Sequence, residues 1–154
     1  MKRLVRVGMA CLFLLVAILP LSSQDQSLQW QALIRQANDL RRKGEYDRAV
    51  EIAQQAFDLV EAYAGPYHPA AGVSLNFLSL IYSAQGNYAQ AEPLFERALA
   101  IRTKVLGEQH PKVAWNLECL SELYRNTGRI EDAQTLKRRA ASIRALQQSN
   151  PVRE

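Results

Sequence analysis

The sequence predicts an all-α fold, an α-solenoid in which three helical hairpins stack side by side. The first observation is a repeat, because several residues recur at a spacing of 42 positions. The recurring sets are Gly44, Gly86 and Gly128; Ala49, Ala91 and Ala133; Ala56, Ala98 and Ala140; and Leu33, Leu75 and Leu117. The second observation is that apolar residues within each copy recur at steps of three and four, as in an amphipathic helix. A fixed period in this range predicts a stacked array.

The first copy covers about residues 28–65. A polar lead-in at Gln24–Ser27 precedes its first helix, which we expect at about Leu28–Lys43, with Ser27 as the N-cap. After a glycine turn, the second helix is expected at about Asp47–Ala62. The side chains expected in the core lie on one stripe of each helix: Trp30, Leu33, Ile34, Ala37 and Leu40, then Ala49, Ile52, Ala53, Ala56, Leu59 and Val60.

The second copy covers about residues 69–107, with helices expected at about Pro69–Gln85 and Ala89–Leu106. Pro69 and Pro93 each fall in the first turn of a helix, where the missing N–H costs little. The expected core residues are Val73, Leu75, Leu78, Leu80 and Tyr82, then Ala91, Leu94, Phe95, Ala98, Leu99 and Ile101.

The third copy, at about residues 111–146, completes a repeat domain that we place at residues 28–147, with a tail at 148–154. Its first helix opens at Pro111, and its second is expected at about Ile130–Leu146. The expected core residues are Val113, Trp115, Leu117, Leu120, Leu123 and Tyr124, then Ala133, Leu136, Ala140 and Ile143.

Residues 1–23 are predicted to be a secretory signal peptide. A basic head is followed by an uncharged run of 18 residues, Val7–Gln24, which ends in small residues. We expect cleavage after Ser23, which would place the mature protein in the periplasm or outside the cell. The alternative is an uncleaved hydrophobic helix at residues 7–24 that anchors the chain, although the run is at the short end of what a bilayer span requires.

The basic head accounts for most of the net charge. The sequence has 19 basic and 15 acidic residues, and removal of Lys2, Arg3 and Arg6 leaves 16 against 15. A mature net charge of +1 does not favour a nucleic-acid partner. Cys119 is then the single cysteine, so we expect no internal disulfide.

Few residues are candidates for chemistry. His68 and His110 each precede a proline, and we expect them to cap the next helix or pack at the corner, since no further metal ligands lie at close spacing. Cys119 is expected to be a buried, small apolar residue. The sequence has no phosphate-binding glycine loop, zinc-protease helix or serine elbow. We therefore expect no enzymatic activity, no cofactor and no metal.

Several short runs carry a family resemblance. They are the two His-Pro openings, Ser74-Leu75-Asn76, Leu80-Ile81-Tyr82, Gly86-Asn87-Tyr88 and the run from Ala91 to Arg102. These runs resemble the tetratricopeptide repeat family, in the 42-residue version found in kinesin light chains. The resemblance covers about residues 28–146. It implies a right-handed superhelix whose concave groove holds a peptide or another protein, usually without catalysis.

The resemblance also implies which residues face the groove, namely those on one side of the first helix of each hairpin. They are Ile34, Asn38 and Arg41 in the first copy, Asn76, Leu80 and Ser83 in the second, and Glu118, Glu122 and Arg125 in the third. In the kinesin light chain type, two adjacent asparagines bind the backbone of a ligand. Here Asn76 is followed by Phe77, so half of that pair is missing.

The charges leave alternatives open. The groove is expected to be basic at one end, with Arg35 and Arg41, and acidic at the other, with Glu118 and Glu122. The two glutamates are either solvated surface charges or a landing site for a basic or amide-rich ligand. The basic run that starts at Lys137 either keeps the open end of the array soluble, as terminal repeats require, or binds anionic lipid or an acidic partner.

Three functions are compatible with these observations. The chain is an exported interaction module, a membrane-tethered assembly factor of the cell envelope, or an accessory subunit or inactive relative of an envelope enzyme. Self-association through an exposed end is also possible. In every case the expected partner is a protein or peptide, and a membrane is involved only through an uncleaved N-terminal segment.

Overall fold

The computed structural model describes residues 22–149, and every regular element among them is an α-helix. The helices are α2 (Ser23–Arg42), α3 (Tyr46–Ala64), α4 (Pro69–Ala84), α5 (Tyr88–Leu106), α6 (Pro111–Asn126) and α7 (Ile130–Ser149). The all-α prediction is confirmed for this part of the chain. The predicted N-terminal signal peptide or hydrophobic helix lies, apart from its last two residues, outside the described range.

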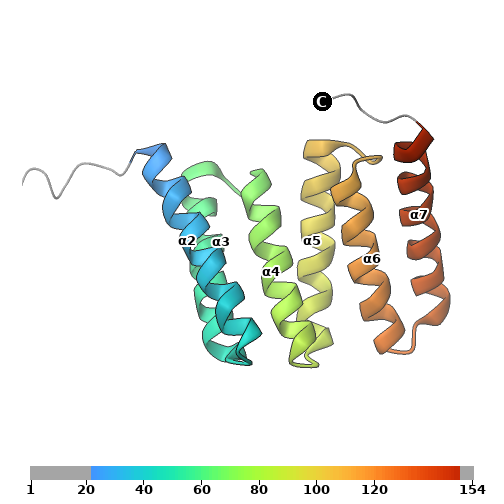
Figure 1. Ribbon diagram of the computed structural model, residues 1–154, viewed down its shortest axis with the longest axis horizontal. Helices are drawn as coiled ribbons and strands as arrows, with labels where there is room; N and C mark the ends of the chain where they lie inside the picture. The colour runs from blue at the N-terminus through green and yellow to red at the C-terminus, as the bar shows by residue number, and fades with distance from the viewer. Residues whose placement is uncertain (1–21, 150–154) are drawn as a thin grey trace, which may run out of the picture.

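Consecutive helices form antiparallel hairpins that stand side by side in a row (Figure 1). Within the hairpins α2 packs on α3, α4 on α5 and α6 on α7, and between hairpins α3 packs on α4 and α5 on α6. A single hairpin cannot enclose its apolar face, so each one depends on its neighbour. The predicted solenoid of three hairpins is confirmed, and the handedness of its superhelix stays a prediction.

The first helix starts earlier than the sequence analysis placed it. The polar lead-in at Gln24–Ser27 is helical, and Ser22 rather than Ser27 is the N-cap. The Ser22 hydroxyl accepts a hydrogen bond from the N–H of Asp25 at 3.2 Å, and the Asp25 carboxylate accepts one from the N–H of Ser22 at 3.3 Å. This reciprocal capping box satisfies two N–H groups at the helix start, which Ser27 could not do from its position one turn later.

The two histidines before proline cap the following helices, as predicted. His68 Nδ1 accepts the N–H of Ala70 at 3.2 Å at the start of α4. His110 Nδ1 accepts the N–H of Lys112 at 3.0 Å at the start of α6. An imidazole therefore takes the place of the usual short polar N-cap residue in both later copies.

Acidification should weaken the α6 cap. Burial, and then the nearby Lys112 and Arg102, hold the pKa of His110 below its ordinary value. The folded protein then binds fewer protons than the unfolded chain, so stability falls as pH drops below about 6.5 toward the lower folded pKa. We expect His110→Asn, which keeps an acceptor at the N-cap, to flatten this step in urea unfolding curves between about pH 7.5 and 5. An unchanged pH slope in the variant would assign the titration to another group.

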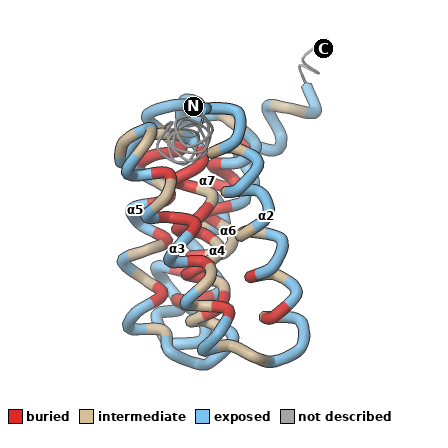
Figure 2. The backbone as a smooth tube through the Cα atoms, turned by 90° about the vertical axis from the view of Figure 1, so that its left-hand side faces the viewer, coloured by how far each residue is buried: buried red, intermediate tan, exposed pale blue. Residues whose placement is uncertain are grey.

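Small residues allow the helices of each hairpin to pack closely. Ala49, Ala91 and Ala133, which occupy the same repeat position, are all buried. A small side chain at a helix crossing lets the two axes approach, and larger residues such as Leu40 and Tyr124 fill the space beside it. Figure 2 shows the buried residues along the inner sides of the helices, with exposed residues outside them.

The core differs from the predicted one at several positions: Ala70, Ala71, Ile81 and Ala114, for example, are buried although the sequence analysis omits them. Trp115 is 37% exposed, because the buried residues of α6 lie on its other side, among them Val113, Leu117 and Leu120. Phe57 is buried although the predicted stripe omits it. It lies one turn beyond Ala53 on α3, so the apolar stripe of this helix is wider than expected.

Candidate partner-binding groove

The helices α2, α4 and α6 are the first helices of the three hairpins, and we call the side on which they lie the groove face. All nine residues that the sequence analysis assigns to a groove lie on these helices. Four of them line one cleft between α4 and α6, and Arg125 lines a second cleft. Asn76 is buried in the interior, and the remaining three lie on α2.

A cleft of about 280 Å³ opens between α4 and α6, and we call it the inner cleft. It is lined by Leu80 and Ser83 from α4, Tyr88 and Phe95 from α5, and Glu118, Cys119, Glu122, Leu123 and Asn126 from α6. Most of this lining is apolar. The predicted residues Leu80, Ser83, Glu118 and Glu122 therefore border one hollow of a size that holds a side chain of a partner.

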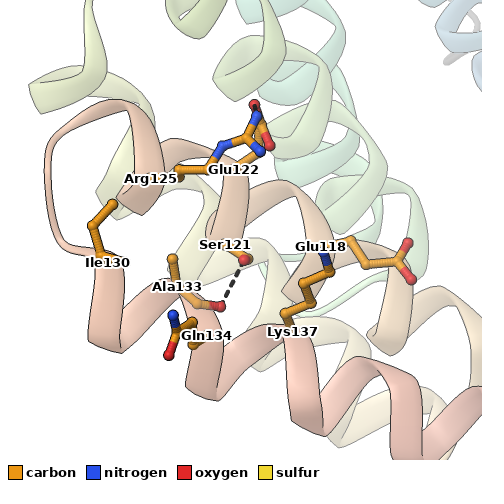
Figure 3. Close-up of a pocket in the computed structure, with 8 residues that line it drawn as sticks. All are labelled: Glu118, Ser121, Glu122, Arg125, Ile130, Ala133, Gln134 and Lys137. Atoms are coloured by element: carbon orange, nitrogen blue, oxygen red, sulfur yellow. Dashed lines mark hydrogen bonds and ion pairs between the residues drawn. The ribbon is translucent and has the colours of Figure 1, made fainter.

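A second cleft of about 310 Å³, the outer cleft, lies between α6 and α7 at the open end of the array. Figure 3 shows its lining residues, which are Glu118, Ser121, Glu122, Arg125, Ile130, Ala133, Gln134 and Lys137. Lys137 occupies the repeat position of Ala53 and Phe95, which the next hairpin covers in the earlier copies. Lys137, Arg138 and Arg139 are all exposed.

Asn76 does not face the groove, which corrects the expectation for this residue. It is 2% exposed, and its amide exchanges two hydrogen bonds with Asn116, at 3.0 and 2.9 Å. Asn116 is also buried and lies on the next hairpin, so the pair joins α4 to α6. Because Asn76 is buried and its amide is paired with that of Asn116, it is not presented to the backbone of a ligand.

A buried arginine completes this interior network. The Nη1 group of Arg102 donates to Asn116 Oδ1 and to the carbonyl of Lys112, and the guanidinium lies 5.2 Å from the centre of the Trp115 ring. Burial lowers the pKa of Arg102 from its ordinary value. Within residues 22–149 it has no carboxylate partner. Its charge is held by amide and carbonyl dipoles and by the ring face.

The two glutamates predicted at the acidic end already have basic partners. Glu118 accepts two hydrogen bonds from Arg144, at 2.5 and 2.7 Å, and Glu122 pairs with Arg125 at 2.5 Å. The hydrogen bond from Arg144 is the main reason that the pKa of Glu118 is lowered, against the opposing effect of burial. The acidic end of the groove is therefore close to neutral overall.

The α2 side of the groove has unsatisfied polar groups instead. The Arg41 Nη2 group donates to Asn38 at 3.0 Å, while Ile34 is half-buried beside them. Within residues 22–149, two buried side-chain atoms lack a hydrogen-bond partner, Arg41 Nε and Ser83 Oγ. The two residues occupy the same repeat position, one on α2 and one on α4. A buried polar atom without a partner costs about 1–3 kcal/mol, and both atoms are enclosed by the protein itself.

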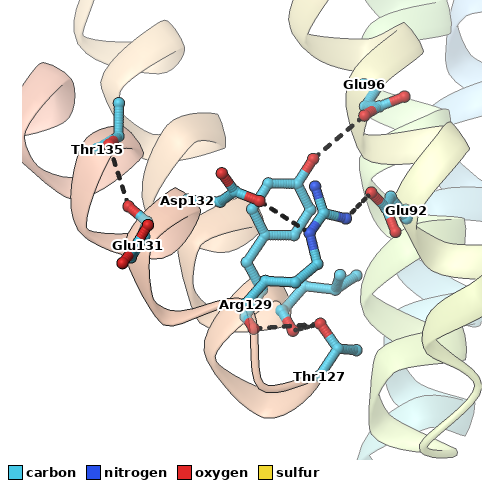
Figure 4. Close-up of polar contacts among 9 residues, drawn as sticks. Glu92, Glu96, Thr127, Arg129, Glu131, Asp132 and Thr135 are labelled. Carbon is cyan, nitrogen blue, oxygen red and sulfur yellow. Dashed lines mark hydrogen bonds and ion pairs between the residues drawn. The ribbon is translucent and has the colours of Figure 1, made fainter.

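A cluster around Tyr124 fixes the third hairpin against the second (Figure 4). The Tyr124 hydroxyl donates to Glu96 at 3.2 Å, and the Arg129 guanidinium lies 3.6 Å from the centre of the Tyr124 ring. Arg129 also pairs with Glu92 of α5 and with Asp132 of α7. These contacts hold the α6–α7 turn against α5, and they thereby fix one side of the inner cleft.

The helices described above also match a known repeat family in sequence. The tetratricopeptide repeat family matches residues 31–104 and, in an overlapping register, residues 75–145. The chain belongs to the tetratricopeptide repeat family. Domains of this family generally bind proteins or peptides, and its members are typically scaffolds rather than enzymes. A comparison with curated proteins gives no match.

Solved structures confirm the resemblance to the kinesin light chain type of tetratricopeptide repeat. BtubC (BKLC) from P. vanneervenii is 26% identical, with a TM-score of 0.75 over 81% of this chain and 49% of that chain. A putative kinesin light chain from Podosopora anserina with nearly identical TPR-like repeats is 25% identical to this chain, with a TM-score of 0.68 over 75% of this chain and 55% of that chain. This tetratricopeptide chain thus spans about half the length of these two relatives.

The tetratricopeptide domain of Arabidopsis FLU shares the fold alone. Its identity is 15% and its TM-score 0.67, over 76% of this chain and 95% of that chain. The fold of this chain is therefore common to proteins with very different sequences.

Cys119 lies in the inner cleft of the tetratricopeptide array and is half-buried rather than fully buried as expected. Burial raises the pKa of its thiol to about 11, and the charge of nearby Arg102 opposes this only in part. Nucleophilic cysteines instead have a lowered pKa, because the thiolate is the reactive form. Cys119 therefore contributes an apolar wall to the cleft rather than a reactive group.

The sequence analysis missed several residues that line the inner cleft or hold its helices in place. Asn116, Arg102, Tyr88 and Arg129 hold or line the cleft, but each lies outside the positions that the family pattern assigns to the groove. The sequence contained one indication of these residues. Arg102 and Arg144 occupy the same repeat position, and a repeated arginine suggests a structural role at both sites.

Proposed function

We propose that this chain is a non-catalytic scaffold that holds a segment of a partner protein on its groove face. The observation that carries the proposal is the inner cleft, which is apolar and opens between two repeats. Leu80, Phe95 and Leu123 provide apolar side chains to its lining, against which an apolar side chain of a partner would lose its contact with water. Because Glu118 and Glu122 are paired within the chain, the apolar cleft provides more of the affinity than the acidic end does.

The location in the cell is a second part of the proposal. A signal peptide at residues 1–23 would export the domain to the periplasm or the outside. The capping box supports retention of Ser22, because cleavage after Ser23 would remove the N-cap and place a positive α-amino group at the start of α2. This favours either a cut before Ser22 or the alternative, an uncut anchor at residues 7–24 of an envelope assembly factor. The mass of the protein isolated from cells distinguishes these possibilities.

A charge placed in the inner cleft should abolish partner capture. Leu80→Glu puts a carboxylate against the apolar wall, and we expect at least a tenfold loss, about 1.4 kcal/mol, of the partner recovered by cross-linking from the native envelope. Ala100→Glu adds the same charge on the exposed side of α5 and serves as the matched control. Circular dichroism melting should show that both variants remain folded.

Equal recovery by the two variants would exclude the inner cleft as the binding site. The identity of the captured protein separates the remaining functions. A single enzyme recovered in equal amount with this chain would indicate that the chain is an accessory subunit of that enzyme.

A further inference from the structure

The large exposed apolar side chains are concentrated at one edge of the array. Among residues 22–149 six such side chains are exposed: Leu28, Tyr67, Val105, Trp115, Ile130 and Leu146. All except Ile130 lie near one end of the hairpins, at the start of α2, the α3–α4 loop, the end of α5, the start of α6 and the end of α7. This is the upper edge in Figure 1, and we call it the apolar edge. Ile130 lies at the opposite edge, at the start of α7.

The charged groups at the apolar edge are of both signs, and one exposed cation, Lys104, lies against an aromatic ring. Lys104 Nζ is 4.1 Å from the centre of the Tyr67 ring, whereas the Arg102 guanidinium, 5.2 Å from that of Trp115, is buried behind the exposed indole. The acidic side chains at this edge each have a partner in the chain: Glu108 lies 3.8 Å from Arg139, Glu61 lies 2.9 Å from Arg97, and Asp25 accepts the N–H of Ser22. Exposed tryptophan and tyrosine beside lysine and arginine are typical of surfaces that contact the headgroup region of a bilayer.

The chain that precedes the described residues joins the domain at this same edge. Ser22 caps the start of α2, so residues 1–21 enter the domain there. That segment contains most of the uncharged run that begins at Val7, together with the basic residues Lys2, Arg3 and Arg6. Among the helices of residues 22–149, none is long and apolar enough to cross a membrane. A tether and a surface patch at one edge would provide the two signals that stable membrane association requires.

We propose that the apolar edge rests on the surface of a membrane that contains anionic lipids. The helices run from this edge to the opposite one, so the groove face stays open to a partner while the edge is in contact with lipid. The distance between the two edges is about 30 Å, the length of a 20-residue helix, which keeps Ile130 clear of the bilayer. The proposal does not depend on the groove, because it uses different residues and a different partner.

Tryptophan quenching by brominated lipid tests the proposal. The full chain is incorporated into vesicles of equal parts phosphatidylglycerol and phosphatidylcholine, with bromine on the acyl chains. Trp30→Phe leaves Trp115 as the single tryptophan at the apolar edge. The matched control adds Trp115→Phe and Ile130→Trp, which moves the single tryptophan to the opposite edge. We expect quenching of Trp115 to exceed that of the control about threefold.

Equal quenching at the two edges, or none at either, would overturn the proposal. Trp30 donates a hydrogen bond to Ser74 at 2.9 Å, so circular dichroism melting must first show that the Phe variants are folded. If Ile130→Trp does not fold, Gln134→Trp places the control tryptophan one turn further along α7 on an exposed site. Partner capture by the Trp30→Phe variant should be unchanged, because Trp30 lines neither cleft, so a failure of this proposal and a failure of the groove proposal give different results.

Discussion

Leu78→Ala should destabilise the protein by about 2–5 kcal/mol. Leu78 is 1% exposed and belongs to the core that joins the first two hairpins, together with Ala53, Phe57 and Leu75. Removal of its isobutyl group loses the transfer free energy of the buried carbons and leaves a cavity that rigid helices can fill only in part. Because the hairpins depend on one another, the loss should appear as a lower midpoint of one cooperative urea transition rather than as a separate early transition.

Leu28→Ala is the matched control, since the same group is removed from a site that is 54% exposed. Its effect should remain within about 0.5 kcal/mol. If the two leucines gave similar small changes, the second hairpin would not be packed against the first in solution as it is in the structure.

Asn116→Ala should cost about 3–5 kcal/mol, as the loss of one partner from a buried charged network does. Asn116 is fully buried and serves Asn76 and Arg102 at the same time. Its removal leaves the Asn76 amide and an N–H of the Arg102 guanidinium without a partner in the interior. A buried group without a partner costs its full desolvation free energy, which exceeds the net contribution of one hydrogen bond to stability. The change should also loosen the contact between α4 and α6 and so enlarge the inner cleft.

Asn126→Ala provides the control on the same helix, because Asn126 is exposed at the rim of the inner cleft. Its unfolding free energy should change by less than about 0.5 kcal/mol. A double-mutant cycle with Asn76→Ala should give a coupling of about 0.5–3 kcal/mol between Asn76 and Asn116. Additive losses would mean that the two amides are not in contact.

One repeat position shows how the end of the array differs from its middle. Asn76 and Glu118 are equivalent, and so are Arg102 and Arg144. In the middle copy a following hairpin provides Asn116, which lies between Asn76 and Arg102. The last copy has no following hairpin among the described residues, and there Glu118 binds Arg144 directly. The glutamate that the sequence analysis placed in the groove therefore has a structural role at the open end.

The sequence by itself determined the helices, their pairing and the family. A 42-residue period, apolar steps of three and four, and glycine at the turns define each hairpin locally, and local rules can be read without a structure. Gly44, Gly86 and Gly128 have φ angles of 79°, 77° and 82°, a conformation that glycine adopts without steric cost. The sequence also contains the capping box of Ser22 and Asp25, but Ser27 is an equally good N-cap residue by type and lies nearer to the apolar stripe of α2.

Only the tertiary structure decided which polar residues are available to a partner. Asn76 and Ser83 lie on the same helix, and the sequence treats them alike. Asn76 is nevertheless paired with an amide of the next hairpin, whereas Ser83 lines the inner cleft and its hydroxyl has no hydrogen-bond partner within residues 22–149. Likewise, the charge of the groove depends on Arg144 and Arg125, which neutralise the two glutamates. Helical periodicity fixes the direction in which a side chain points, whereas its hydrogen-bond partner depends on which residue of another hairpin lies opposite, and that is set by how the hairpins pack.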